Sequence, residues 1–318
     1  MNILLHAGFP KCASSFLQQI FFERHPGIQY LGSYFGDGKR VVYEDGFHSL
    51  FYNRHMAEID LAIAIEDGIE FNIDAMKKSF QNDVLPHFID TKPLVYSSEM
   101  LSLAPHLGRD VLAERVHAIF GKCKVLFIIR NQFNALLSAY KDDCRSRSLA
   151  YSEFPTTFSE WRKLNKGVPF RKLKGRFDYF DQIACYQKLF GAENVHVLMY
   201  EDLNQNTEKF LRSLCAIVGV PFYEEMLEWA DEKVHSAPDR ALLESNLIFN
   251  AHRFLRPWLR RLPEAFFRHF IFRRGMAADY QEQLSEEDRA HLTDIYRAGN
   301  RELTSSFALP LQEHGYPL

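Results

Sequence analysis

Residues 2–17 read Asn-Ile-Leu-Leu-His-Ala-Gly-Phe-Pro-Lys-Cys-Ala-Ser-Ser-Phe-Leu, and this stretch decides the fold. An apolar run, a turn of small residues and a helical pattern follow one another, as in loops that bind phosphate at a helix N-terminus. Nucleoside triphosphatases have a first glycine, then four residues of any type, and then Gly-Lys-Ser/Thr. On that template Gly8 takes the first glycine and Ala13 the second, but the lysine stands early, at Lys11. The pattern therefore predicts a phosphate-binding loop for a cofactor that needs no metal.

Two motifs resemble a known family. Residues 10–17 resemble the Pro-Lys-x-Gly-Thr/Ser-Thr/Ser-x-Leu loop with which sulfotransferases hold the 5′-phosphosulfate end of 3′-phosphoadenosine 5′-phosphosulfate (PAPS). Residues 125–140 resemble the second PAPS signature of that family, a buried strand that ends in Arg-Asn/Asp, with a serine eight residues later and then a tyrosine. The resemblance implies a sulfotransferase with PAPS as co-substrate and no metal.

Two weaker matches extend the resemblance over nearly the whole chain. Residues 195–203 contain the Tyr-Glu-Asp that follows a strand in the family, and residues 272–275, Phe-Arg-Arg-Gly, resemble the loop that closes over the 3′-phosphate. The resemblance implies cofactor contacts for Lys11, Cys12, Ala13, Ser14, Ser15, Phe16, Arg130, Ser138, Tyr200, Arg273, Arg274 and Gly275. The chain departs from the family at Ala13, which replaces a glycine, and at Gln132, which replaces a proline.

Several of these residues have an expected physical role. Lys11 is expected to neutralise the charge that grows on the bridging oxygen as the sulfuryl group leaves. Ser14 and Ser15 suit a helix N-cap whose N–H groups also bind the 5′-phosphate. Arg130 ends a buried strand, so it needs an anionic partner, and a bidentate grip on the 3′-phosphate is favoured over an ion pair with Asp142. Arg273 and Arg274 equally fit a solvated basic face.

The general base is predicted from the turn between the two main motifs. Cytosolic sulfotransferases place a histidine there, whereas this chain has Tyr-Ser-Ser-Glu-Met at residues 96–100. Glu99 is similar to the glutamate base of heparan-type and several bacterial sulfotransferases, and a carboxylate with a raised pKa can deprotonate a hydroxyl about 3 Å away. A capping or ion-pair role is the alternative for Glu99. His6, His106 and His235 are the rival bases, with His6 expected to be structural.

Length and composition fit one large α/β domain. A chain of 318 residues, of which 47% are hydrophobic, buries about three-quarters of its unfolded surface. The net charge of −3 gives no general attraction to nucleic acid. Five scattered cysteines contain no Cys-x-x-Cys pair, which indicates neither a disulfide framework nor a zinc site. No stretch of 18 apolar residues occurs, and we expect a cytoplasmic protein.

Four short apolar runs predict a parallel sheet. They are Ile3–His6, Pro93–Ser97, Lys124–Ile129 and Val195–Met199, and a helical pattern follows each run. We therefore expect a three-layer, P-loop-like α/β fold with a central parallel sheet and helices on both faces. The motifs lie at the carboxyl ends of the strands, where such sheets bind ligands. One domain is expected over residues 1–318, with insertions at 32–91 and 151–176 that build the acceptor pocket.

The acceptor is predicted from charge. Seven basic residues lie between Trp161 and Arg176, namely Arg162, Lys163, Lys166, Arg171, Lys172, Lys174 and Arg176. Such a cluster suits an anionic acceptor, for example a sulfated or uronate-bearing glycan, although a solvated helix face fits equally. Residues 254–272 mix aromatic residues with arginine and suit either a membrane surface or a packed element interrupted by prolines.

The sequence thus predicts a PAPS-dependent sulfotransferase that acts in line on a hydroxyl of a carbohydrate such as a glycan or glycolipid. Two alternatives remain open. A nucleotide-dependent kinase of P-loop type is disfavoured because the lysine is displaced and because Arg130 stands where a Walker B aspartate is expected. A non-catalytic glycan-binding protein of the same fold is the other.

Overall fold

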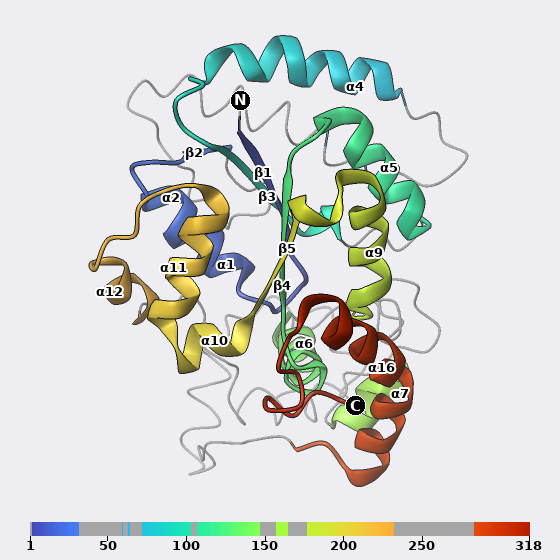
Figure 1. The fold of residues 1–318 in the computed structure, drawn as a ribbon. Coiled ribbons are helices and arrows are strands. Elements are labelled where there is room, and N and C mark those ends of the chain that lie inside the picture. Colours follow the sequence, from blue (N-terminus) through green and yellow to red (C-terminus); the bar gives the residue numbers. More distant parts are fainter. Residues whose placement is uncertain are drawn as a thin grey trace, which may run out of the picture.

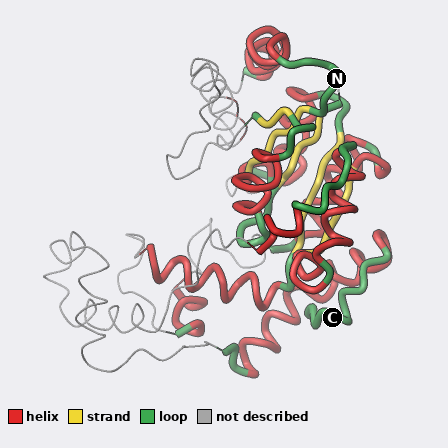
Figure 2. Tube along the Cα trace, turned by 90° about the vertical axis from the view of Figure 1, so that its left-hand side faces the viewer, coloured by secondary structure: helices red, strands yellow, loops and turns green. Residues whose placement is uncertain are grey.

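A five-stranded parallel sheet forms the centre of the molecule, in the order β2-β3-β1-β4-β5. Its strands are β1 (Ile3–Ala7), β2 (Gln29–Tyr30), β3 (Leu94–Ser98), β4 (Lys124–Ile129) and β5 (Val195–Met199). The computed structural model describes residues 2–31, 59, 63, 72–102, 107–146, 157–164, 177–231 and 283–318. Figure 2 shows the strands side by side between helices.

The helices form layers on both faces of the sheet. They are α1 (Ser14–Phe16), η1 (Leu17–Phe21), α2 (Phe22–Arg24), α4 (Ile73–Ser79), η2 (Phe80–Val84), η3 (Leu85–His87), η4 (Glu99–Leu101), α5 (Arg109–Phe120), α6 (Gln132–Ser146), α7 (Phe158–Leu164), α9 (Tyr179–Phe190), η7 (Ala192–Asn194), α10 (Tyr200–Gln205), α11 (Thr207–Val218), α12 (Met226–Asp231) and α16 (Glu286–Phe307). Figure 1 shows α1, α2, α11 and α12 on one side of the sheet and α5 and α9 on the other. The predicted three-layer α/β class is confirmed.

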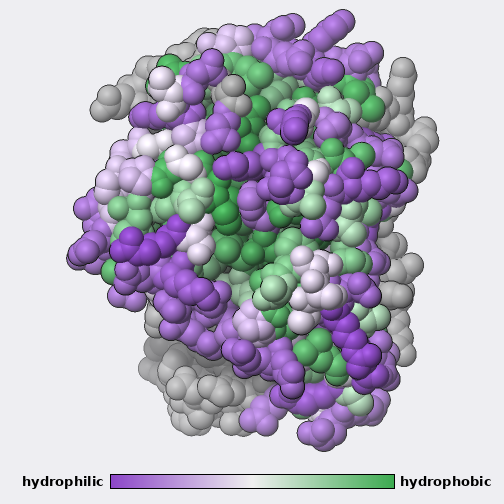
Figure 3. Space-filling model, in the orientation of Figure 1, coloured by the Kyte–Doolittle hydropathy of each residue, from purple (hydrophilic) through white to green (hydrophobic). Residues whose placement is uncertain are grey.

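The strand sequences explain the layers. The last five residues of β4, Val125–Ile129, are all buried, as expected for a central parallel strand that helices cover on both faces. The edge strand β5 keeps three half-buried residues in its middle, His196–Leu198. In the orientation of Figure 1, hydrophobic residues gather along the middle of the molecule, where β5 lies, and hydrophilic residues surround them (Figure 3).

The four predicted strands are present to within one residue at each end. The structure adds the two-residue strand β2, which pairs with β3 through Gln29 and Tyr30. Most of the predicted insertions at 32–91 and 151–176 lies outside the described residues, as does the whole of 254–272. Among the helices that the structure describes, none has both the length and the apolar character needed to cross a membrane.

Candidate active site

The phosphate loop joins β1 to α1 in a tight turn. Lys11 and Ala13 both have a φ of 65°, in the left-handed region that L-residues other than glycine, asparagine and aspartate seldom occupy. Ala13 therefore adopts the backbone conformation for which the family uses glycine. Gly8 is required for a different reason, because a Cβ on it would lie 2.7 Å from Ser14 Oγ. The loop thus reaches the compact form that the alanine put in question.

The side chains of the loop turn inward. Ser14 Oγ donates to the carbonyl of Phe9 at 3.3 Å, and the fully buried Cys12 Sγ lies 3.8 Å from Tyr179 Oη. Burial raises the pKa of the Cys12 thiol to about 12, so the thiol stays neutral and unreactive. Ala13 stands at the N-cap of α1 and has no side-chain acceptor for the first N–H groups of the helix. Those N–H groups and the helix dipole suit an anion.

Arg130 links the second motif to this loop. It follows β4 directly, and its Nη1 donates to the carbonyl of Lys11 at 2.9 Å. Its guanidinium carbon lies 4.3 Å from the ring centroid of Tyr200, a cation–π distance. Its Nε is buried and has no hydrogen-bond partner among the described residues. A buried donor of this kind is typical of a site that binds an anion.

Lys11 forms an ion pair with Asp142 on α6. The two charged atoms, Lys11 Nζ and Asp142 Oδ2, lie 3.5 Å apart, and both side chains are partly exposed. Asp142 therefore pairs with Lys11, whereas the alternative from the sequence paired it with Arg130. Ser138 lies on α6 one turn before Asp142 and is half-buried.

Glu99 lies in a turn that is hydrogen-bonded to the phosphate loop. It opens η4 directly after β3, and the Gly8 N–H donates to the Ser98 carbonyl at 3.2 Å. Ser102 Oγ donates to the Gly8 carbonyl at 2.7 Å. Burial and the Tyr179 hydrogen bond have the largest effects on the pKa of Cys12. The Arg130 charge also lowers this pKa and the Glu99 charge raises it, which indicates that both charges lie near Cys12. The structure thus brings Glu99, Lys11 and Arg130 together around one loop.

The rival base His6 is a structural residue. It is fully buried, and burial lowers its pKa to about 3, so the ring is neutral at physiological pH. Its Nδ1 lies 2.7 Å from Ser97 Oγ, which also accepts a hydrogen bond from Gln18 Nε2 at 3.0 Å. Ser15 and Phe16 lie in α1, where Ser15 is half-buried and Phe16 is buried. Five predicted residues lie outside the described part of the chain, namely His106, His235, Arg273, Arg274 and Gly275.

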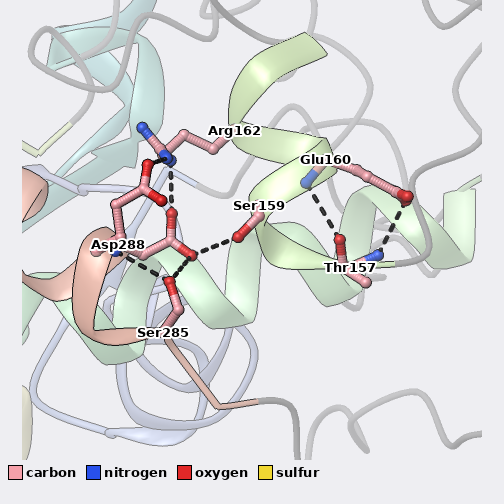
Figure 4. Close-up of polar contacts among 7 residues, drawn as sticks. Thr157, Ser159, Glu160, Arg162, Ser285 and Asp288 are labelled. Carbon is pink, nitrogen blue, oxygen red and sulfur yellow. Dashed lines mark hydrogen bonds and ion pairs between the residues drawn. The ribbon is translucent and has the colours of Figure 1, made fainter.

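The structure corrects the prediction for one member of the basic cluster. Arg162 is buried, and its Nε lies 2.6 Å from Asp288 Oδ1 (Figure 4). Asp288 also accepts hydrogen bonds from Ser159 Oγ at 2.6 Å and Ser285 Oγ at 2.8 Å. Burial acts to raise the pKa of Asp288, but these hydrogen bonds and the Arg162 charge lower it overall. Arg162 therefore joins α7 to α16 and is not available to an acceptor, whereas Lys163 is exposed.

The sequence did not predict the residues that hydrogen-bond to the backbone of Arg130 and Asn131. Tyr179 Oη donates to the Arg130 carbonyl at 2.7 Å, and the buried Glu201 accepts from the Asn131 N–H at 2.8 Å. Glu201 could be identified as the middle residue of the Tyr-Glu-Asp motif, but its hydrogen bond with Asn131 could not be predicted. Tyr179 gave no signal, because it is one of many aromatic residues in the chain.

Comparison with known proteins gives the family of the chain. A sulfotransferase domain model matches residues 3–307. The chain is 22% identical over 225 residues to sulfotransferase 6B1 of Danio rerio, which covers 67% of this chain and 65% of that protein. It is also 22% identical over 262 residues to sulfotransferase 1B1 of Mus musculus, which covers 79% of this chain and 80% of that protein. The chain thus spans just under two thirds of the zebrafish relative.

The fold is likewise similar to that of a solved sulfotransferase from Alicyclobacillus acidocaldarius. The TM-score is 0.57 at 15% identity, with 99% of this chain and 98% of that chain covered. The fold and the loop define an α/β protein with a glycine-containing turn between β1 and α1 at the carboxyl edge of its parallel sheet. The chain belongs to the sulfotransferase domain family. The predicted sulfotransferase family is confirmed.

Proposed function

We propose that this chain binds PAPS at residues 8–16 and at Arg130 and transfers its sulfuryl group to a hydroxyl of a carbohydrate. The observation that carries the proposal is the hydrogen bond from Arg130 Nη1 to the Lys11 carbonyl, because it makes one site of the two PAPS motifs. An anion held at the N-terminus of α1 lies beside the cation of the second motif. The kinase alternative lacks such support, since the family match is to sulfotransferases.

The proposed cofactor contacts follow from this geometry. The first N–H groups of α1 hold the 5′-phosphate, together with Ser14 and Ser15. Arg130 and Ser138 hold the 3′-phosphate, and the ring of Tyr200 keeps the guanidinium in place. Lys11 leaves Asp142 and neutralises the charge on the bridging oxygen as the sulfuryl group departs. Contacts of the residues 273–275 with the 3′-phosphate remain part of the proposal.

Glu99 acts as the general base. Its carboxylate takes the proton of the acceptor hydroxyl as that oxygen bonds to sulfur. The bond between sulfur and the bridging oxygen breaks in the same displacement, and its electron pair stays on the phosphate. The products are adenosine 3′,5′-bisphosphate (PAP) and a sulfate ester. The hydrogen bonds of Gly8 with Ser98 and Ser102 hold the base and the phosphate loop in one arrangement.

Two features support a carbohydrate acceptor, namely the glutamate base and the basic residues that follow it in the chain. A glutamate in this turn is similar to the base of carbohydrate sulfotransferases, and the basic residues from Lys163 to Arg176 would attract an anionic glycan. Arg162 is not part of that patch, because it is paired with Asp288. We further propose that one domain spans residues 1–318, with acceptor-pocket insertions at 32–91 and 151–176.

A transfer assay tests the proposal. Labelled PAPS is offered with glycans, glycolipids and phenols, and we expect sulfation of a carbohydrate. Glu99→Gln should lower turnover by about a hundred- to ten-thousandfold without changing PAP affinity. The matched control is Glu302→Gln, an exposed site on α16. A phenol as the best acceptor would overturn the carbohydrate assignment, and a fully active Glu99→Gln enzyme would overturn the base. Tight glycan binding without transfer would favour the non-catalytic alternative.

A further inference from the structure

A buried carboxylate connects the Arg130 turn to the segment after α16, which we define as residues 309–318. Glu201 Oε1 accepts from the Asn131 N–H at 2.8 Å, and Glu201 Oε2 accepts from Tyr316 Oη at 2.9 Å. Glu201 and Tyr316 are both buried. Burial first, and then the Glu201 charge, raise the pKa of Tyr316 well above its ordinary value, so the hydroxyl keeps the proton that it donates.

The segment after α16 makes further contacts with the same turn. Asn131 Nδ2 donates to the His314 carbonyl at 2.9 Å, while Asn131 Oδ1 accepts from the Phe133 N–H at 2.9 Å and so caps α6. The next residue is also held, because Gln132 Nε2 lies 2.7 Å from Asn300 Oδ1. Asn300 in turn donates to the Pro317 carbonyl at 2.8 Å.

Three groups at the Arg130 turn are therefore held by residues far away in the sequence. The Arg130 carbonyl accepts from Tyr179, the following N–H donates to Glu201, and the Asn131 side chain binds the segment after α16. Figure 1 shows this segment beside α6, at the carboxyl edge of the sheet. We propose that Glu201 and Tyr316 are positioning residues of the 3′-phosphate site, which hold Arg130 at the angle needed to bind that phosphate. The inference rests on the proposed role of Arg130.

The expected size of the effect follows from the buried carboxylate. Without the Tyr316 hydroxyl, Glu201 Oε2 becomes a buried acceptor without its partner, which favours movement of Glu201 and of the turn that it binds. If only a fraction of the molecules then keeps Arg130 in place, the apparent affinity for a 3′-phosphate is the intrinsic affinity multiplied by that fraction. We expect Tyr316→Phe to weaken PAP binding by about three- to thirtyfold.

Two ligands separate positioning from a general loss of structure. PAP carries both phosphates, whereas adenosine 5′-monophosphate lacks the 3′-phosphate and does not use Arg130. Calorimetric titration should show weaker PAP binding to Tyr316→Phe and Glu201→Gln, with unchanged binding of adenosine 5′-monophosphate. The control is Val218→Ala, which removes buried volume at the amino edge of the sheet, where the Val218 carbonyl accepts from Asn2. It should lower the unfolding temperature without changing PAP affinity.

A double-mutant cycle completes the test. If Tyr316 acts through Arg130, Tyr316→Phe should weaken PAP binding in the parent and should have no further effect in Arg130→Ala. Equal weakening of both ligands, or additive losses in the double variant, would overturn the inference. If Arg130→Ala weakens PAP binding but Tyr316→Phe does not, the positioning role fails and the proposed function stands. If Arg130→Ala leaves PAP affinity unchanged, the 3′-phosphate contact itself is wrong.

Discussion

Replacement of Arg162 by leucine tests whether this arginine is structural. Asp288 is 1% exposed, and its carboxylate pairs with Arg162 Nε at 2.6 Å. Removal of the cation leaves a buried carboxylate whose remaining partners are the hydroxyls of Ser159 and Ser285. Breaking a buried ion pair in this way typically costs about 3–5 kcal/mol. We expect Arg162→Leu to lose that free energy of unfolding.

Urea denaturation followed by circular dichroism measures the loss. Lys163→Leu is the matched control, because Lys163 is the exposed neighbour on α7, and it should change the free energy of unfolding by less than about 0.5 kcal/mol. The double variant Arg162→Leu/Asp288→Leu should recover part of the loss, since no charge then stays buried alone. PAP affinity at 20 °C should be the same in all of these proteins.

One result would refute this reasoning. If Arg162→Leu left the stability unchanged and instead raised the KM for an anionic acceptor, Arg162 would belong to the acceptor-binding cluster that the sequence suggested. The paired geometry in Figure 4 would then not be the one that matters in solution.

Three further predictions concern β1 and the phosphate loop. The His6 pKa of about 3 lies below its unfolded value of 6.5, so the unfolded chain binds more protons than the folded chain between these pH values. The free energy of unfolding should therefore fall by about 2 kcal/mol from pH 7 to pH 5, and an unchanged pH dependence in His6→Gln would contradict this. Asp142→Asn should tighten PAP binding by about two- to fivefold in calorimetry, because the carboxylate competes for Lys11, and weaker binding would count against it. Ala13→Gly should keep PAP affinity and raise the free energy of unfolding by at most about 1 kcal/mol, since the relief of left-handed strain exceeds the entropy that glycine adds to the unfolded chain. A clear loss of stability would show that the alanine is not strained.

Local patterns predicted the fold class and the contiguous segments from which the candidate site is built. The phosphate loop and the buried run that ends at Arg130 are each contiguous, so their residues could be interpreted without tertiary information. The strand β2 has only two residues and therefore no periodicity to detect. The structure also showed that Ala13 reaches the left-handed conformation, which residue type alone did not settle.

Contacts between distant residues were beyond the reach of the sequence. Arg162 pairs with Asp288, which lies 126 positions later and carries no motif. Glu201 was noticed for its motif, but its role depends on Tyr316, which lies 115 positions later. In both cases the residue type indicated a charge that needs a partner, and only the fold identified the partner.

The central claim is that one site, built from Lys11 and Arg130, binds PAPS through both phosphate groups without a metal. Calorimetric titration of PAP and ATP, each with and without Mg²⁺, tests it most directly. We predict that PAP binds without Mg²⁺ and about ten- to a hundredfold more tightly than ATP, because ATP lacks the 3′-phosphate that we propose Arg130 binds. Equal affinity for the two nucleotides, or PAP binding that requires Mg²⁺, would contradict the account.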